Sequence, residues 1–176
     1  MSGANARVSL VLGGARSGKS AYAEMLVRAL PAPWIYCATA QALDDEMRER
    51  IAHHRAGRAQ GWITLETPLH LAEAVAAAAH PMLVDCLTLW LTKIMLAGRD
   101  VLAETSHLLA AAKASNAPIV FVSNEVGLGI VPDNALARAF RDHAGRLNQE
   151  IAKTASKVVF MAAGLPMMLK DNPEMA

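Results

Sequence analysis

The chain has 176 residues, a length that fits one domain of ordinary size. It is 53% hydrophobic and 19% charged, so it can build a full core and is not expected to be disordered. Lys and Arg together number 17 against 16 Asp and Glu, a net charge of +1. This balance argues against a nucleic-acid-binding protein, because such proteins usually carry a clear basic excess.

Short apolar segments alternate along the chain with longer segments rich in Ala, Leu and charged residues. The expected strands are Val8–Leu12, Trp34–Ala38, Trp62–Leu65, Met82–Asp85, Ile119–Ser123 and Val158–Ala162. The expected helices are Lys19–Leu30, Asp44–Arg55, Leu69–Ala79, Leu87–Leu96, Val101–Ala114 and Asn134–Thr154. Strands that are apolar on both faces are typical of a buried parallel sheet, and the alternation predicts a doubly wound α/β fold. We expect residues 1–170 to form a single domain and residues 171–176 a frayed C-terminal tail.

The compartment is indicated by the N-terminus and by the cysteines. Met1 to Arg7 lack the apolar stretch of a signal peptide, and no apolar run approaches the about 20 residues that a membrane span needs. Cys37 and Cys86 lie in apolar segments and have no metal-binding spacing. We therefore predict two buried, reduced thiols in a cytoplasmic protein.

A phosphate-binding loop follows the first expected strand and opens the first expected helix. It matches the pattern G-x-x-x-x-G-K-[ST] with the residues Gly13, Gly14, Ala15, Arg16, Ser17, Gly18, Lys19 and Ser20. Glycines let backbone N–H groups approach phosphate oxygens, and the helix N-terminus adds positive potential. Lys19 would reach the β- and γ-phosphates, and the Ser20 hydroxyl would bind Mg²⁺. The motif predicts a nucleoside triphosphate enzyme.

A second metal ligand is expected at the end of a buried strand. Asp85 ends the segment Met82–Asp85 and would hold Mg²⁺ directly or through water. The same residue could instead cap the helix that follows. With a phosphate loop in the same chain, the metal role is favoured.

Four further segments extend the pattern beyond the phosphate loop. In order they are Asp44–Met47, Arg50–Arg55, Asn124–Pro132 and Phe140–Gln149. Together with the loop, this series resembles the bifunctional adenosylcobinamide kinase/adenosylcobinamide-phosphate guanylyltransferase family of cobalamin biosynthesis, from Val8 to about Lys170. The resemblance implies a three-layer, RecA-like P-loop NTPase fold with a mostly parallel sheet, and a homotrimer with nucleotide sites near the subunit interfaces.

The resemblance also implies two reactions. The hydroxyl of the aminopropanol arm of adenosylcobinamide is phosphorylated by ATP or GTP. GMP is then transferred from GTP to this phosphate through a GMP-histidine intermediate, which gives adenosylcobinamide-GDP and pyrophosphate. The nucleophile would be His53, the first residue of a His-His pair. A neutral imidazole is nucleophilic near pH 7, so its chemistry agrees, although a paired histidine at a helix end is also common on protein surfaces.

Other nucleotide contacts are implied position by position. They are the segment Ala38, Thr39 and Ala40, the segment His54, Arg55, Ala56 and Gly57, and the side chains of Glu66 and Asp85. Glu66 is a hypothesis for guanine recognition, because a carboxylate can accept hydrogen bonds from guanine N1–H and N2–H₂. Some relatives carry Glu at the position of Asp85, and either carboxylate can serve Mg²⁺.

The segment after the fifth expected strand offers further candidates. Glu125 is a possible base for the acceptor hydroxyl, or it is a structural turn residue. Arg138, Arg141 and Arg146 lie in the next helix and either bind phosphate or face solvent. Two other functions stay open: a kinase that has lost the guanylyl step, and a regulatory P-loop ATPase that forms no covalent nucleotide.

Overall fold

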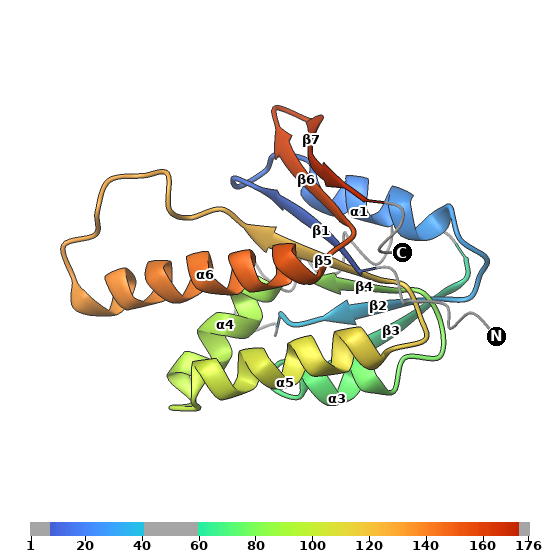
Figure 1. The fold of residues 1–176 in the computed structure, drawn as a ribbon, viewed down its shortest axis with the longest axis horizontal. Helices are drawn as coiled ribbons and strands as arrows, with labels where there is room; N and C mark the ends of the chain where they lie inside the picture. The colour runs from blue at the N-terminus through green and yellow to red at the C-terminus, as the bar shows by residue number, and fades with distance from the viewer. Residues whose placement is uncertain (1–7, 41–59, 173–176) are drawn as a thin grey trace.

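The computed structural model describes residues 8–40 and 60–172 and contains one seven-stranded sheet (Figure 1). The strands are β1 (Val8–Gly13), β2 (Trp34–Ala38), β3 (Trp62–Glu66), β4 (Met82–Asp85), β5 (Ile119–Asn124), β6 (Lys157–Ala162) and β7 (Leu165–Asp171). Their order across the sheet is β3-β2-β4-β5-β1-β6-β7. All neighbouring pairs are parallel except β6 and β7, which pair antiparallel.

Helices cover both faces of this sheet. They are α1 (Lys19–Arg28), α3 (Leu71–Ala76), α4 (Leu87–Leu96), α5 (Val101–Ala114) and α6 (Ala135–Thr154). In Figure 1, α3, α4, α5 and α6 lie on one face and α1 on the other. The predicted three-layer α/β fold with a mostly parallel sheet is therefore confirmed. None of the helices among the described residues is both long and apolar enough to cross a membrane.

The core divides into two halves because successive strand residues point to opposite faces. On the α1 side, Ala23 and Val27 of the helix pack with Leu83 of β4 and Val122 of β5. On the other side, Trp90 of α4 is fully buried in a larger cluster with side chains of α3, α5 and α6. Several strands contribute to both clusters, so the central sheet is apolar on both faces, as the sequence predicts.

Helices α1 and α3 are shorter than predicted by two residues or more. Helix α1 ends at Arg28 rather than Leu30, because the Leu30 N–H turns back to the Val27 carbonyl in a tighter 3₁₀ bond and Pro31 follows. Helix α3 spans Leu71–Ala76 instead of Leu69–Ala79. The predicted helix Asp44–Arg55 lies outside the described residues.

The two edges of the sheet depart from the sequence prediction. Strand β3 is mostly exposed and not buried on both faces, because it pairs only with β2. Strand β7 was not predicted, since its side chains are exposed and it contains Pro166, which central strands avoid. The turn before it uses Ala163 and Gly164, both with positive φ, as in a tight hairpin. The prediction of a tail from residue 171 is wrong for two residues: Asp171 belongs to β7, and Asn172 N–H bonds the Ser156 carbonyl at 2.8 Å.

Candidate functional site

The predicted site residues within the described part of the chain lie at the edge of the sheet where the parallel strands end. Glu66 pairs with Ala38, which in turn pairs with Asp85, so three of them stand side by side across β3, β2 and β4. On the next two strands, Gly13 pairs with Asn124. Ligands of open α/β sheets bind at this carboxyl edge, so the topology collects the candidates where a nucleotide is expected.

The phosphate loop connects β1 to α1 and depends on its two outer glycines. Gly13 has φ +151° and Gly18 has φ +95°. A Cβ on Gly13 would collide with the Met161 carbonyl oxygen and lie 2.7 Å from the Ser17 hydroxyl. Gly14 meets no such obstacle, because no described atom lies within 4 Å of the position that a Cβ would take there. Gly13 therefore allows the loop to pack against β6, whereas Gly14 keeps the backbone of the loop accessible to a ligand.

The loop itself presents the groups that an anion requires. Gly14, Ala15, Arg16 and Gly18 are exposed, and α1 has no acidic residue in its first turn to neutralise its positive end. The Lys19 side chain is buried and donates to the Gly14 carbonyl, so its ammonium is folded back over the loop. These positions suit phosphate binding by backbone N–H groups with a lysine above them.

Ser17 has a buried hydroxyl that forms no hydrogen bond among the described residues. Its carbonyl accepts the Gly164 N–H at 3.1 Å, which ties the loop to the β6–β7 turn. A buried polar atom without a protein partner calls for an explanation, such as a bound ligand, ion or water. Phosphate binding is a suitable explanation here, because the hydroxyl lies within the phosphate loop.

Ser20 and Asp85 lie on the same face of the sheet. Leu83 packs against α1, and Asp85 is two residues further along β4, so its side chain also faces α1. Ser20 lies in the first turn of α1, which packs over β4 and β5. One strand separates β4 from β1, which places the two strands about 10 Å apart. Helix α1 contacts both of these strands.

This donor set fits Mg²⁺. Magnesium prefers oxygen ligands and usually takes one or two from the protein, with the remaining positions filled by water and substrate phosphates. A hydroxyl and a carboxylate meet that requirement. No group of three or more His, Cys, Asp or Glu suited to a metal occurs in residues 8–40 and 60–172.

Two residues that sequence reasoning missed as positioning groups hold the end of β4. The Tyr36 hydroxyl donates to Asp85 Oδ2 at 2.8 Å. The Thr39 hydroxyl donates to the Cys86 carbonyl at 2.7 Å and accepts from the Cys86 N–H at 2.8 Å. Tyr36 is buried on the same face as Asp85. Only the register between β2 and β4 reveals these partners, since Tyr36 is 49 residues away from Asp85.

The other implied nucleotide contacts lie at the ends of β2 and β3. Thr39 N–H bonds the Asp85 carbonyl at 3.2 Å, and the Ala38 carbonyl accepts from Thr67 N–H at 3.0 Å. Much of the hydrogen-bonding capacity of this segment therefore serves the sheet. Ala40 is the last residue of the first described range. Glu66 ends the exposed edge strand and is itself exposed.

Glu125 stands directly after β5, beside the phosphate loop. Its N–H donates to the Gly13 carbonyl at 3.0 Å, and its Oε1 accepts the Gly127 N–H at 2.5 Å. One carboxylate oxygen thus stabilises the turn, as the structural alternative predicts. The bond from its backbone N–H places Glu125 next to the first residue of the phosphate loop, so a role for this residue near the loop is compatible with the structural one.

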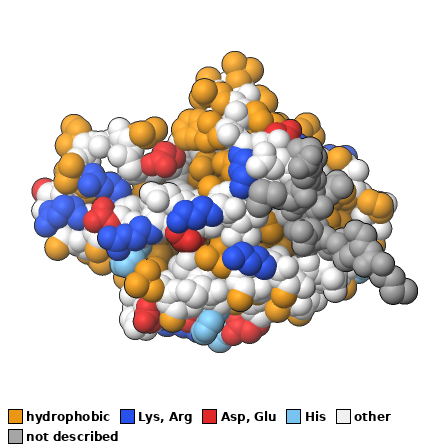
Figure 2. Space-filling view, in the orientation of Figure 1, with side chains coloured by type: hydrophobic (Ala, Val, Ile, Leu, Met, Phe, Trp, Pro, Cys, Tyr) orange, Lys and Arg blue, Asp and Glu red, His pale blue; other side chains and the backbone are white. Residues whose placement is uncertain are grey.

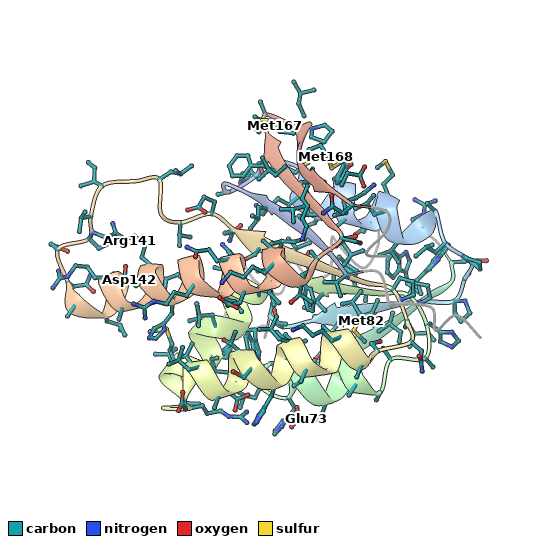
Figure 3. All side chains as sticks on the ribbon, in the orientation of Figure 1. Glu73, Met82, Arg141, Asp142, Met167 and Met168 are labelled. Atoms are coloured by element: carbon teal, nitrogen blue, oxygen red, sulfur yellow. The ribbon has the colours of Figure 1, made fainter. Side chains whose placement is uncertain are left out.

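The arginines of α6 differ in their surroundings. Arg138 donates to the carbonyls of Pro132 at 3.0 Å and Asp133 at 2.6 Å, and so stabilises the β5–α6 loop. Arg141 is partly buried and lies 3.9 Å from Asp142 (Figure 3). Arg146 is exposed.

Both cysteines are free and buried, as predicted. Burial raises the pKa of the Cys37 thiol to about 12. The pKa of Cys86 is also raised, first by burial and then by the charge of neighbouring Asp85. These thiols are core groups and not nucleophiles.

The predicted nucleophile and its neighbours lie outside the described residues. They are His53, His54, Arg55, Ala56 and Gly57. The described part of the site is therefore the phosphate loop with Asp85, Glu66 and Glu125 along the sheet edge.

Comparison with known proteins assigns the family. A family described as cobinamide kinase / cobinamide phosphate guanyltransferase matches residues 9–169. The chain belongs to this family. A bifunctional adenosylcobalamin biosynthesis protein, CobP, of Pseudomonas aeruginosa is 48% identical over 169 residues, covering 93% of this chain and 98% of its own. CobU of Escherichia coli K12, of the same description, is 42% identical over 179 residues, covering 92% and 98%.

A solved structure supports the fold alone. A protein from Pyrococcus horikoshii OT3 superposes with a TM-score of 0.53 at 10% identity, covering 97% of this chain and 89% of its own. The cobinamide kinase/guanyltransferase family is one of enzymes with two activities, so the sequence-based expectation of a bifunctional enzyme of this family is confirmed.

Proposed function

We propose that this enzyme phosphorylates adenosylcobinamide on its aminopropanol hydroxyl with ATP or GTP, and then guanylylates the product from GTP through His53. The proposal rests on one observation above all. The family match spans residues 9–169, and within it the phosphate loop, Asp85 and Glu125 meet at one edge of the sheet. The enzyme would act in the cytoplasm as a homotrimer.

In the kinase step, the acceptor oxygen forms a bond to the γ-phosphorus while the bond from that phosphorus to the β–γ bridging oxygen breaks. The hydroxyl proton passes to Glu125 or to water. The loop N–H groups and Lys19 stabilise the charge on the transferring group and on the departing diphosphate. Ser20 and Asp85 would hold Mg²⁺, which neutralises phosphate charge when it is bound.

In the guanylyl step, an imidazole nitrogen of His53 attacks the α-phosphorus of GTP and pyrophosphate departs. A phosphate oxygen of adenosylcobinamide phosphate then attacks the same phosphorus. The P–N bond breaks, the histidine is regenerated, and adenosylcobinamide-GDP is released. Glu66 would select guanine by accepting from N1–H and N2–H₂, since adenine presents no such pair of donors.

The decisive experiment uses GTP labelled at the α-phosphate. We expect acid-labile, alkali-stable label on the denatured protein, and we expect it to be lost in His53→Ala. His107→Ala is a matched control, because His107 is an exposed histidine of α5 and is not among the predicted site residues. Absence of label from the wild type, or label that survives His53→Ala, would refute the intermediate.

The kinase step is tested separately with γ-labelled ATP or GTP and adenosylcobinamide. We expect His53→Ala to keep this transfer. A protein that hydrolyses nucleotide without phosphorylating the corrinoid would be a P-loop ATPase and would contradict the proposal. A Glu66→Gln variant with unchanged preference for GTP over ATP in the labelling reaction would refute the guanine role alone.

A further inference from the structure

A pocket of about 540 Å³ lies between α6, the β5–α6 loop and the β6–β7 hairpin. Its size falls within the range of small-molecule sites. Leu12 and Val158 contribute to its wall, and both belong to the core cluster on the α6 side of the sheet. The pocket is therefore on the opposite face from Ser20 and Asp85, which lie on the α1 side.

The pocket adjoins the phosphate loop directly. Leu12 immediately precedes Gly13, and Glu125 lines the pocket while its N–H bonds the Gly13 carbonyl at 3.0 Å. A molecule in this pocket would reach the phosphate loop by passing Glu125. Ser20 and Asp85, which would hold the metal, lie on the opposite face of the sheet. An acceptor could thus reach the transferring phosphate without displacing the metal ligands.

The wall next to α6 carries polar groups suited to amides. Asn148 is 6% exposed, and its Nδ2 donates to the Asn124 carbonyl at 3.3 Å. Its Oδ1 has no hydrogen-bond partner among the described residues. Gln149 is exposed beside it, and Glu125 adds a carboxylate. A buried acceptor without a donor points to a ligand that brings an N–H group.

Apolar side chains surround these polar groups. Leu128 and Leu169 line the pocket and are 83% and 58% exposed. Next to them, Ile130 is 97% exposed on the loop and Met167 is 55% exposed on β7. Figure 2 shows hydrophobic side chains gathered on the hairpin at the top, and Figure 3 places Met167 there. Exposed apolar patches beside a pocket mark a surface that binds a large ligand or partner.

We propose that this pocket binds the corrinoid acceptor of the kinase step. A corrinoid is a wide ring with methyl groups and amide side arms at its periphery. The methyl groups match Leu128, Leu169 and the exposed hairpin, and the amide arms match Asn148, Gln149 and Glu125. The ring would lie across the mouth of the pocket, with the hydroxyl-bearing arm directed past Glu125 to the phosphate loop. This inference rests on the proposed function.

The test measures binding of adenosylcobinamide to the full chain by equilibrium dialysis in the dark, without nucleotide. Leu128→Asp and Gln149→Ala alter exposed side chains of the pocket. The matched controls are Leu102→Asp, a 63% exposed leucine on α5, and Asp142→Ala, an exposed residue on α6 outside the pocket. Binding of a fluorescent GTP analogue and the mass of the assembly by light scattering are measured in parallel.

We expect the Kd for adenosylcobinamide to rise about tenfold or more in Leu128→Asp, since apolar contacts of this size contribute that much. In Gln149→Ala we expect a rise of about threefold, typical of one neutral hydrogen bond. The Kd for adenosylcobinamide should not change in the two control variants, and the affinity for the GTP analogue should not change in any variant.

Three results would overturn the inference, and they are distinguishable. If the wild type binds adenosylcobinamide and both variants bind it equally well, the pocket assignment falls while the proposed function stands. If the wild type neither binds nor phosphorylates adenosylcobinamide, the proposed function falls and the inference with it. If Leu128→Asp dissociates the assembly while Gln149→Ala binds normally, the face belongs to an interface with a second copy of the chain.

Discussion

The hydrogen bond between Tyr36 and Asp85 offers a direct test of how the metal ligand is held. Tyr36→Phe removes only the hydroxyl that donates to Asp85 Oδ2 at 2.8 Å. The ring remains packed on the α1 side of the sheet, 6.1 Å from the Trp62 ring in an edge-on arrangement. The substitution should therefore leave the packing intact and release the carboxylate.

The expected magnitude follows from the burial of the two partners. A hydrogen bond to a charged group contributes about 1.5–3 kcal/mol. Tyr36 is 5% exposed, but Asp85 is only half-buried, so water can replace part of the interaction. We expect the free energy of unfolding to fall by about 1–2 kcal/mol. For a chain of this length, each kcal/mol corresponds to about 2–4 °C in Tm.

The chain contains a matched control, since its second tyrosine is Tyr22. Tyr22 packs partly buried against the same cluster, and no hydrogen bond of its hydroxyl is found within the described residues. Urea unfolding of Tyr22→Phe should show a change below about 0.5 kcal/mol. GTP binding is then measured by calorimetric titration at varied Mg²⁺ concentration. The Mg²⁺ concentration needed for half-maximal GTP binding should be about tenfold higher in Tyr36→Phe, because groups that orient a metal ligand change metal affinity by this much.

A double-mutant cycle that combines Tyr36→Phe with Asp85→Asn tests whether the hydroxyl acts through Asp85. If Tyr36 acts through Asp85, the two substitutions should couple by about 1 kcal/mol in unfolding. Equal stabilities of Tyr36→Phe and Tyr22→Phe, together with an unchanged Mg²⁺ requirement, would refute the argument. Destabilisation without coupling would mean that the hydroxyl serves another group.

The remaining predictions concern the phosphate loop and the thiols. Lys19→Met should lower kcat/KM of the kinase step by about 10²–10³-fold in a radiometric assay, because one preorganised charged donor is lost; a smaller loss would contradict its assigned role. Gly13→Ala should lower the free energy of unfolding by about 2–4 kcal/mol through positive φ and the clash with Met161, whereas Gly14→Ala, with open space, should stay within about 0.5 kcal/mol. Cys37 and Cys86 should resist iodoacetamide at pH 8 in the native protein and react on unfolding, and prompt alkylation of the folded chain would show that they are accessible. Folding raises the pKa of Cys37 from about 9 to about 12, so this thiol ionises at a lower pH in the unfolded chain than in the folded one. In urea titrations the free energy of unfolding should therefore fall progressively as the pH rises above about 9.

The sequence predicted the described central strands and most of the described helices closely. Strands β2 and β4 and helices α4 and α5 have the predicted bounds, because strong apolar patterns and clear breaks such as Gly98 define them. The phosphate loop could be recognised from spacing alone, since a turn that wraps a phosphate needs glycine at fixed positions. Strand β7 could not, because an exposed antiparallel edge strand gives a weak local pattern and depends on pairing with β6.

The site divides in the same way. Local sequence determined that Gly13 to Ser20 match a phosphate-binding loop, that Asp85 ends a buried strand, and that the chain resembles a two-step transferase family. Only the tertiary structure decided which residues face one another, because the register between strands that are distant in sequence is a property of the whole sheet. That register brings Tyr36 to Asp85 and Glu125 to Gly13, and the packing of α6 against the hairpin leaves the pocket beside the phosphate loop.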